Sequence, residues 1–190
     1  VGADEADHAL QEFRRLSSLL RLPRLIPRLD IKGENVIKGI NFEGLRVVGK
    51  PAELARKYAS DADELLYIDA VASLCGRNAI ERLLEETSRD VFIPITVGGG
   101  IRSRADVERL LRAGADKVAI NTAAIANPKL LADLADHYGS QAIVCSIEAK
   151  RIAEGWECYT DGGRQRTGRE AQGWAQEAVA LGVGELLLTS

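Results

Sequence analysis

Short apolar runs alternate with amphipathic stretches along most of this chain, and this alternation limits the possible folds more than any other feature. Six runs are predicted strands: residues 25–31, 65–70, 93–97, 118–121, 142–147 and 186–190. Five stretches between them have helical patterning: 51–60, 77–89, 103–113, 128–137 and 169–181. Strands that are apolar along nearly their whole length are typical of a parallel sheet covered by helices.

The even spacing of the strand–helix units favours a (β/α)8 barrel (a TIM barrel) over an open nucleotide-binding sheet. A whole barrel needs about 250 residues, whereas the chain has 190. We therefore expect about six of the eight units and interpret the chain as a fragment without the last two. Its start at Val1, its lack of methionine and its end at Ser190, directly after an apolar run, favour the same interpretation.

A weak internal repeat accompanies the alternation. Residues 63–69 echo residues 184–190, and residues 28–32 echo residues 146–150. A repeat of this kind predicts a barrel built from two half-barrels, in which the first and fifth strands are equivalent.

The first 22 residues form a separate question, because their apolar residues lie at helical spacing ahead of the first predicted strand. These residues are Leu10, Phe13, Leu16 and Leu20. We expect a helical extension over 1–22 that either caps the barrel or belongs only to the start of the fragment, and a partial barrel over 23–190. A glycine-rich stretch at 155–168 is expected to form a hairpin-like loop over the barrel.

Two acidic residues follow equivalent strands. Asp30 and Glu148 come at the ends of the first and fifth predicted strands, where barrel enzymes place catalytic groups. Two carboxylates that face one substrate can serve as acid and base. Alternatively, each is a solvated carboxylate or pairs with the nearby Lys32 or Lys150. Asp69 ends the second strand and is expected to reach the same end of the barrel.

Glycines follow the third predicted strand. Gly99 and Gly100 lie in a Val-Gly-Gly-Gly-Ile segment, and backbone N–H groups in such a segment can approach a phosphate closely. Asn121 and Thr122 end the next strand and could add side-chain donors. A tight turn is the alternative, and the spacing does not match a dinucleotide-binding fingerprint.

Four charged residues stand just before the first, second, fourth and sixth strands: Arg24, Glu64, Lys117 and Glu185. Charges of alternating sign at this end of a barrel could form a closed ring of salt bridges. From position and composition alone, we favour ordinary solvated charges at the starts of strands.

Composition excludes several classes of function. The net charge of −3 without a basic stripe argues against nucleic acid as a partner. No apolar run approaches the roughly 18 residues that a membrane span requires. The three cysteines, Cys75, Cys145 and Cys158, fit neither a disulfide framework nor a zinc site. Two histidines leave acid–base chemistry mainly to carboxylates, so we expect no metal or cofactor. Without a signal peptide at the start, a cytoplasmic location is expected.

Five motifs occur in one order between Pro23 and Ser190: 24–32 (RLIPRLDIK), 36–42 (VIKGINF), 96–102 (TVGGGIR), 114–124 (GADKVAINTAA) and 139–144 (GSQAIV). Together they resemble the cyclase subunits of imidazole glycerol phosphate synthase, in histidine biosynthesis. The resemblance implies a lyase that takes ammonia from a glutaminase subunit. Its other substrate is a bis-phosphorylated ribulosyl aminoimidazole carboxamide nucleotide, and its products are imidazole glycerol phosphate and aminoimidazole carboxamide ribotide.

The resemblance also implies roles for individual residues. The two catalytic aspartates of the family correspond to Asp30 and Glu148, and a lysine of the first loop corresponds to Lys38. The second phosphate site of the family corresponds to Gly100, Asn121 and Thr122, next to Gly99 and Asp69. Its ammonia gate corresponds to Arg24, Glu64, Lys117 and Glu185. This match reverses the interpretation of those four residues as ordinary solvated charges.

Two departures from the family pattern keep alternatives open. Glutamate replaces aspartate at 148, and a carboxylate displaced by about 1 Å can cost around 100-fold in rate. The last two strands, and with them the first phosphate site, are missing. One alternative is a paralogous subunit that transfers ammonia to a sugar in surface polysaccharide synthesis. Another is a non-catalytic remnant that docks a glutaminase. The related isomerase of the histidine pathway matches less well, because the gate residues and the 36–42 motif follow the cyclase.

Overall fold

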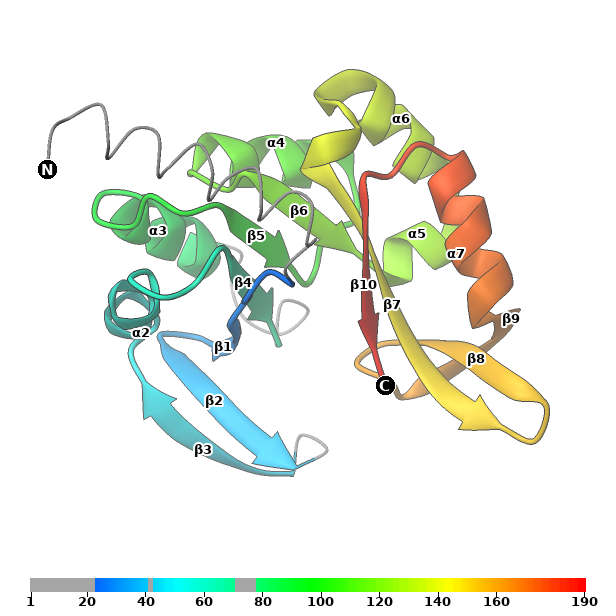
Figure 1. The fold of residues 1–190 in the computed structure, drawn as a ribbon, viewed down its shortest axis with the longest axis horizontal. Coiled ribbons are helices and arrows are strands. Elements are labelled where there is room, and N and C mark those ends of the chain that lie inside the picture. The colour runs from blue at the N-terminus through cyan, green and yellow to red at the C-terminus, as the bar shows by residue number, and fades with distance from the viewer. Residues whose placement is uncertain (1–22, 41–42, 71–77) are drawn as a thin grey trace, which may run out of the picture.

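The computed structural model describes residues 23–40, 43–70 and 78–190. The predicted helix within 1–22 and Cys75 lie outside these residues. Figure 1 shows the arrangement of the elements.

Six parallel strands form the central sheet, in the order β1–β4–β5–β6–β7–β10. They are β1 (Arg28–Lys32), β4 (Leu65–Asp69), β5 (Ile95–Gly98), β6 (Lys117–Ile120), β7 (Ile143–Ile152) and β10 (Glu185–Thr189). The main helices between them are α2 (Pro51–Tyr58), α3 (Asn78–Thr87), α4 (Arg104–Arg112), α6 (Lys129–Tyr138) and α7 (Ala171–Ala180). A short helix, α5 (Thr122–Ala126), and a 3-10 turn, η1 (Ser140–Ala142), complete the connections. The predicted alternation of strands and helices is confirmed.

The strands are staggered as barrel closure requires. One line of paired residues crosses the sheet, through Asp30, Ile68, Gly98, Ala119, Val144 and Glu185. This line begins in the middle of β1 and ends at the first residue of β10. Such a stagger is the shear that tilts strands against a barrel axis. It also places Asp30 and Glu185 on the same face of the sheet, because residues paired across a ladder point to one side.

Two hairpins extend the sheet, and the sequence predicted one of them. β2 (Asn35–Ile40) and β3 (Glu43–Gly49) follow β1, while β8 (Gly155–Thr160) and β9 (Gln165–Glu170) follow β7. β2 pairs antiparallel with β1, and β8 pairs antiparallel with β7. Figure 1 shows both hairpins beyond the carboxyl ends of the parallel strands. The two halves of the chain thus share a strand–hairpin–helix–strand order, as the internal repeat predicts.

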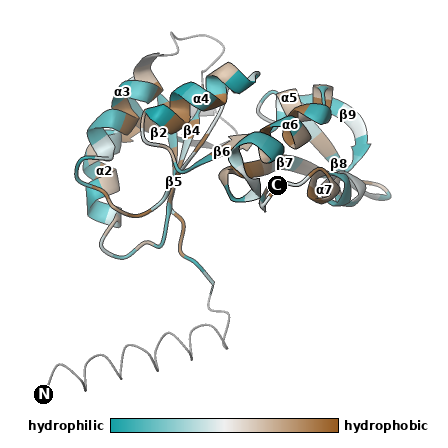
Figure 2. Ribbon diagram, turned by 90° about the horizontal axis from the view of Figure 1, so that it is seen from above, coloured by the Kyte–Doolittle hydropathy of each residue, from teal (hydrophilic) through white to brown (hydrophobic). Residues whose placement is uncertain are grey.

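The apolar core lies between the sheet and the helices. Residues of the inner strands β4, β5 and β6, such as Tyr67, Val97 and Val118, are buried in this core, and the helices carry apolar and polar residues on different sides (Figure 2). The buried Tyr67 hydroxyl hydrogen-bonds Thr87 Oγ1 at the end of α3, at 3.1 Å. Trp174 on α7 is buried.

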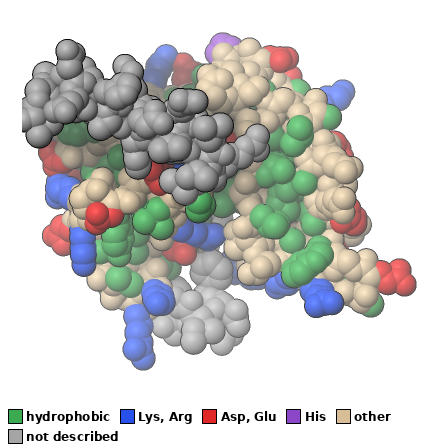
Figure 3. All heavy atoms as spheres, viewed as in Figure 1, with side chains coloured by type: hydrophobic (Ala, Val, Ile, Leu, Met, Phe, Trp, Pro, Cys, Tyr) green, Lys and Arg blue, Asp and Glu red, His purple; other side chains and the backbone are tan. Residues whose placement is uncertain are grey.

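The last strand, β10, is less buried than the other parallel strands. Leu186 and Leu188 on β10 are exposed, as is Val179 on the neighbouring α7. Figure 3 shows hydrophobic side chains gathered over these two elements. Among the described residues, β10 pairs with β7 and with no other strand. None of the described helices is long and apolar enough to cross a membrane.

Candidate active site and charged collar

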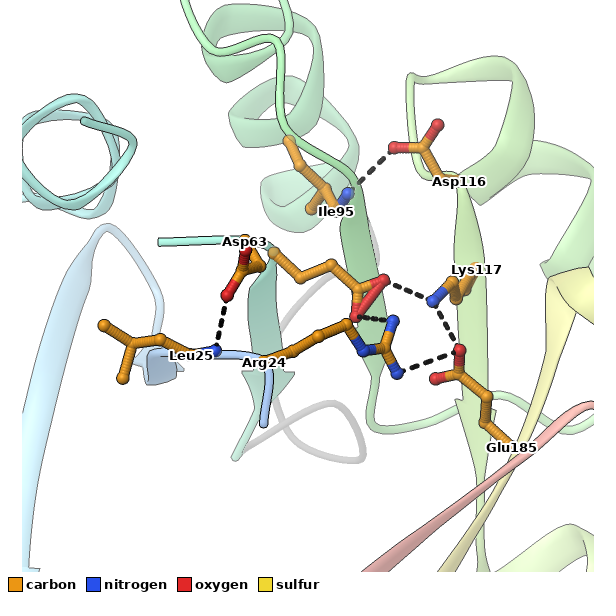
Figure 4. A network of polar contacts seen from close by, with 8 residues as sticks. Arg24, Leu25, Asp63, Ile95, Asp116, Lys117 and Glu185 are labelled. Atoms are coloured by element: carbon orange, nitrogen blue, oxygen red, sulfur yellow. Dashed lines mark hydrogen bonds and ion pairs between the residues drawn. The ribbon is translucent and has the colours of Figure 1, made fainter. Parts of the chain in front are cut away.

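Four charged side chains form a closed ring at the amino ends of the strands, and we call this ring the collar. It consists of Arg24, Glu64, Lys117 and Glu185. The Arg24 guanidinium donates to Glu64 Oε2 and to Glu185 Oε1, each at 3.2 Å. Lys117 Nζ donates to Glu185 Oε1 at 2.7 Å and also to Glu64 Oε1. Figure 4 shows Arg24, Lys117 and Glu185 pointing toward one another from different segments of the chain. The interpretation as separate solvated charges is wrong.

Burial within the collar is uneven. The side chains of Glu64 and Lys117 are 4% and 13% exposed, whereas that of Arg24 is 50% exposed. Burial disfavours the charged form of Lys117, but hydrogen bonds to Glu185 and Glu64 outweigh it and raise the pKa of the ammonium group. Burial of Glu185 is likewise outweighed, by the hydrogen bond from Lys117 and the charges of Lys117 and Arg24, so the pKa of Glu185 is lowered. The contacts of the collar therefore favour the charged forms of Lys117 and Glu185.

Neighbouring backbone contacts fix the segments that carry the collar. Asp63 Oδ2 accepts a hydrogen bond from the Leu25 N–H at 2.7 Å. Asp116 Oδ2 accepts one from the Ile95 N–H at 2.8 Å (Figure 4). Each aspartate directly precedes a collar residue, so the same contacts that start the strands also position Glu64 and Lys117.

At the carboxyl ends of the strands, the region we call the mouth, Asp30 is held by an arginine. Arg28 Nε donates to Asp30 Oδ1 at 2.9 Å, and Arg28 Nη2 lies 2.8 Å from the same oxygen. Both residues belong to β1 and point to one face, because they are two positions apart. The sequence-based alternative that Asp30 pairs with Lys32 is not what the structure shows.

Glu148 has different surroundings. It lies where β7 leaves the parallel sheet, since Glu148 pairs with Thr189 on one side and with Tyr159 of β8 on the other. Burial raises the pKa of Glu148, against the opposing effects of a backbone hydrogen bond from Gly163 and the charge of Arg28. Its Oε2 atom is buried and has no hydrogen-bond partner among the described residues. Such an atom is costly to bury and marks a place where a ligand could supply the missing partner.

Lys150, the other partner suggested for Glu148, has contacts of its own. Its Nζ donates to the Gly163 carbonyl at 2.5 Å and lies 4.7 Å from the centre of the Tyr159 ring. Both contacts fasten the β8–β9 hairpin to β7.

The glycine segment after β5 packs closely on β4. Gly99 has φ +98°, and a Cβ atom there would collide with the backbone of Asp69. Gly100 also has a positive φ, of 67°. The segment leads through buried Ile101 into α4, whose N-cap Ser103 accepts a hydrogen bond from the Asp106 N–H. Glycine is therefore required at 99, and Asp69 lies directly beside this part of the mouth.

Asn121 and Thr122 contact the second hairpin. Asn121 Nδ2 donates to the Tyr159 carbonyl at 3.1 Å, and Thr122 Oγ1 accepts a hydrogen bond from the Asp161 N–H at 3.4 Å. The structure thus brings the end of β6 together with the β8–β9 hairpin. Lys38 lies on the other hairpin, on β2, where it is exposed and paired with Arg46 of β3.

Sequence reasoning missed Arg28. This residue lies in the repeated 28–32 segment, and its period-two spacing from Asp30 was the available signal. Its guanidinium also reaches the sixth strand, because Nη1 donates to Thr189 Oγ1 at 3.3 Å. No group of three or more metal-binding side chains occurs within 23–40, 43–70 and 78–190.

Comparison with known proteins gives one consistent family. The family model described as "Histidine biosynthesis protein" matches residues 24–190. A protein of Legionella pneumophila named "Imidazole glycerol phosphate synthase subunit HisF" is 60% identical over 169 residues, which cover 88% of this chain and 80% of that protein. A protein of the same name from Myxococcus xanthus is 54% identical over 168 residues, and the match covers 66% of its length.

Proposed function

This chain belongs to the histidine biosynthesis protein family, and we propose that it acts as an ammonia-dependent cyclase of the imidazole glycerol phosphate synthase type. The observation that carries this proposal is a closed charged collar below two carboxylates on equivalent strands. In this role the protein is a lyase. It converts the bis-phosphorylated ribulosyl aminoimidazole carboxamide nucleotide into imidazole glycerol phosphate and aminoimidazole carboxamide ribotide.

The mouth provides the acid–base groups. Asp30 is ion-paired with Arg28 and is suited to accept a proton. Glu148 is the carboxyl group whose pKa burial raises, so it is suited to donate one. Two carboxyl groups whose surroundings differ in this way can divide acid and base work in one site.

The collar is the proposed entrance for ammonia from a glutaminase subunit. Ammonia released into neutral water is mostly protonated and loses its nucleophilic lone pair, so a sheltered path from the partner is chemically useful. Arg24 and Lys117 each contact both glutamates of the collar, Glu64 and Glu185. Arg24 is the most exposed of the four residues. Breaking the contacts of Arg24 disturbs the buried pair least, so we propose that the collar opens at this residue.

Phosphate recognition is proposed for the rim next to Asp69. Gly99 and Gly100 bring backbone close to the mouth, and Asn121 and Thr122 stand at the neighbouring strand end. Lys38 on the first hairpin adds a mobile cationic group that could reach the substrate. A cytoplasmic location fits this role and agrees with the unpaired, buried thiols of Cys145 and Cys158.

The test is turnover by the full-length protein. We expect it to form imidazole glycerol phosphate from the nucleotide and an ammonium salt at mildly alkaline pH, and to form none when ammonium is left out. A folded protein that binds a glutaminase but converts nothing would favour the non-catalytic alternative.

A second acceptor is favoured by Glu148, because its longer side chain ends in a buried oxygen without a partner. In the paralogous role, ammonia would be transferred to a sugar of surface polysaccharide synthesis. Glu148→Asp separates the two roles. Nucleotide turnover that is preserved or raised supports the cyclase, whereas a fall of about 100-fold shows that glutamate serves another acceptor.

A further inference from the structure

Arg28 lies between the two carboxylates of the mouth. Its guanidinium contacts Asp30 on its own strand and Thr189 on β10, and Thr189 is the pairing partner of Glu148. We infer that Arg28 is a positioning residue that holds Asp30 as the proton acceptor and thereby leaves Glu148 as the proton donor. This inference rests on the proposed function and extends it to a residue to which the resemblance assigned no role.

The contacts with Asp30 fix the carboxylate without covering it. Nε and Nη2 of Arg28 both approach the same oxygen, Oδ1, at 2.9 and 2.8 Å. The second oxygen, Oδ2, takes no part in this pair and can face a reacting group. Charge-assisted bonds of this length also hold a side chain in one rotamer, which acid–base catalysis requires.

The contact with Thr189 fixes the guanidinium itself. Since Nη1 donates to Thr189 Oγ1 at 3.3 Å, the arginine is tied to both β1 and β10 and cannot swing away with one strand. This anchoring brings its charge close enough to Glu148 to act on it.

Burial explains why Glu148 remains the donor. It is the largest effect and raises the pKa of Glu148, and the charge of Asp161 adds to it, while the backbone hydrogen bond from Gly163 and the charges of Arg28 and Lys150 act in the opposite direction. Arg28 thus hydrogen-bonds Asp30 directly, whereas it acts on Glu148 only through its charge. The two carboxyl groups therefore have different surroundings although they occupy equivalent positions in the repeat.

If Arg28 served only to stabilise the fold, its loss would mainly lower the free energy of unfolding. The side chains of Arg28 and Asp30 are 31% and 29% exposed, and ion pairs with this exposure contribute little to the free energy of unfolding. Loss of Arg28 should therefore change acid–base behaviour much more than stability.

The experiment compares Arg28→Met and Arg28→Lys with the parent protein. Arg112→Met is the matched control, because Arg112 pairs with Glu108 on the outer surface of α4. We expect Arg28→Met to lower kcat by about 100-fold with KM nearly unchanged. The loss falls on kcat because Asp30 is no longer held in one position by the two contacts of the guanidinium. Arg28→Lys should restore only part of kcat, since lysine lacks the planar fork of donors.

A second readout does not depend on turnover. Carbon-13 NMR of the side-chain carboxyl group of Glu148 follows its protonation directly. The charge of Arg28 lowers the pKa of Glu148, so in Arg28→Met the titration midpoint of Glu148 should move to higher pH, and in Arg112→Met it should not move. An unchanged midpoint in Arg28→Met would overturn the inference, as would kinetics equal to those of the control. Absence of nucleotide turnover in the parent would instead count against the proposed function, and the NMR result would still decide the role of Arg28.

Discussion

Arg24 and Glu185 lie 161 residues apart in the chain, yet the Arg24 guanidinium donates to Glu185 Oε1 at 3.2 Å. This contact joins the segment before the first parallel strand to the start of the sixth. Since Arg24 also contacts Glu64, it completes a ring whose other cation, Lys117, bridges the same two glutamates. The ring thus joins two cations and two anions, each cation in contact with both glutamates.

Removing the buried cation should destabilise the protein. Lys117→Met leaves Glu64, whose side chain is 4% exposed, without its closest partner. Loss of one member of a buried pair costs about 3 kcal/mol, because the remaining charge is uncompensated. Urea unfolding of Lys117→Met and of the conservative Lys117→Arg measures this cost. A decrease below about 1 kcal/mol in the free energy of unfolding of Lys117→Met would contradict the buried ring.

Removing the exposed cation should affect coupling rather than stability. Arg24→Ala opens one side of the collar while Lys117 still pairs with both glutamates. We expect glutamine-driven turnover with the glutaminase to fall more than turnover driven by added ammonium salt. The ratio of the two rates is the measurement, and Arg112→Met again serves as the surface control. Equal changes in both rates would show that the collar does not conduct ammonia.

A matched pair of glycine variants tests the rim. Gly99→Ala and Gly155→Ala both place alanine at a positive φ, of 98° and 118°, which costs about 1–3 kcal/mol. Only the alanine at 99 also meets the Asp69 backbone, whereas nothing lies within 4 Å of a Cβ at 155. Thermal unfolding should show the larger loss for Gly99→Ala, and its KM for the nucleotide should rise. A similar loss of stability in both variants, without a change in KM, would argue against the close packing at the rim.

Glu148 should make stability depend on pH in a definite direction. Because burial raises its pKa in the folded state, folding favours its protonated form, and its ionisation disfavours the folded state as pH rises. Glu148→Gln removes this penalty. The variant should match the parent near pH 4, about the pKa of an ordinary glutamate, and become more stable relative to it toward pH 7. Urea unfolding at both pH values measures the difference, and a gap that narrows as pH rises would refute the assignment.

Much of the fold could be predicted from the sequence because it follows from local patterns of apolar and polar residues. Apolar runs and the helical patterning between them predicted the six strands and five main helices. The repeat of 28–32 in 146–150 predicted the equivalence of Asp30 and Glu148, which both lie where a barrel strand begins to pair with a hairpin.

The remaining features depend on contacts between distant residues. The β2–β3 hairpin is held by pairing with β1 rather than by a strong turn signal of its own. Arg28 has no role that its neighbours in sequence reveal, because its second partner, Thr189, lies 161 residues away. For the same reason position alone favoured solvated charges at the four strand starts, whereas the resemblance to the cyclase family predicted that these four residues act together. The structure brings them into contact from distant segments of the chain.

Turnover by Asp30→Asn tests the central claim most directly. Asparagine keeps the size of the side chain and removes the charge that pairs with Arg28, so the proposed proton acceptor at the mouth is lost. Rates with the nucleotide and ammonium salt should be compared for Asp30→Asn, the parent protein and the surface control Arg112→Met. We predict that ammonia-dependent turnover is abolished in Asp30→Asn while its unfolding transition stays cooperative. Turnover within tenfold of the parent would contradict the assignment of the mouth as the active site.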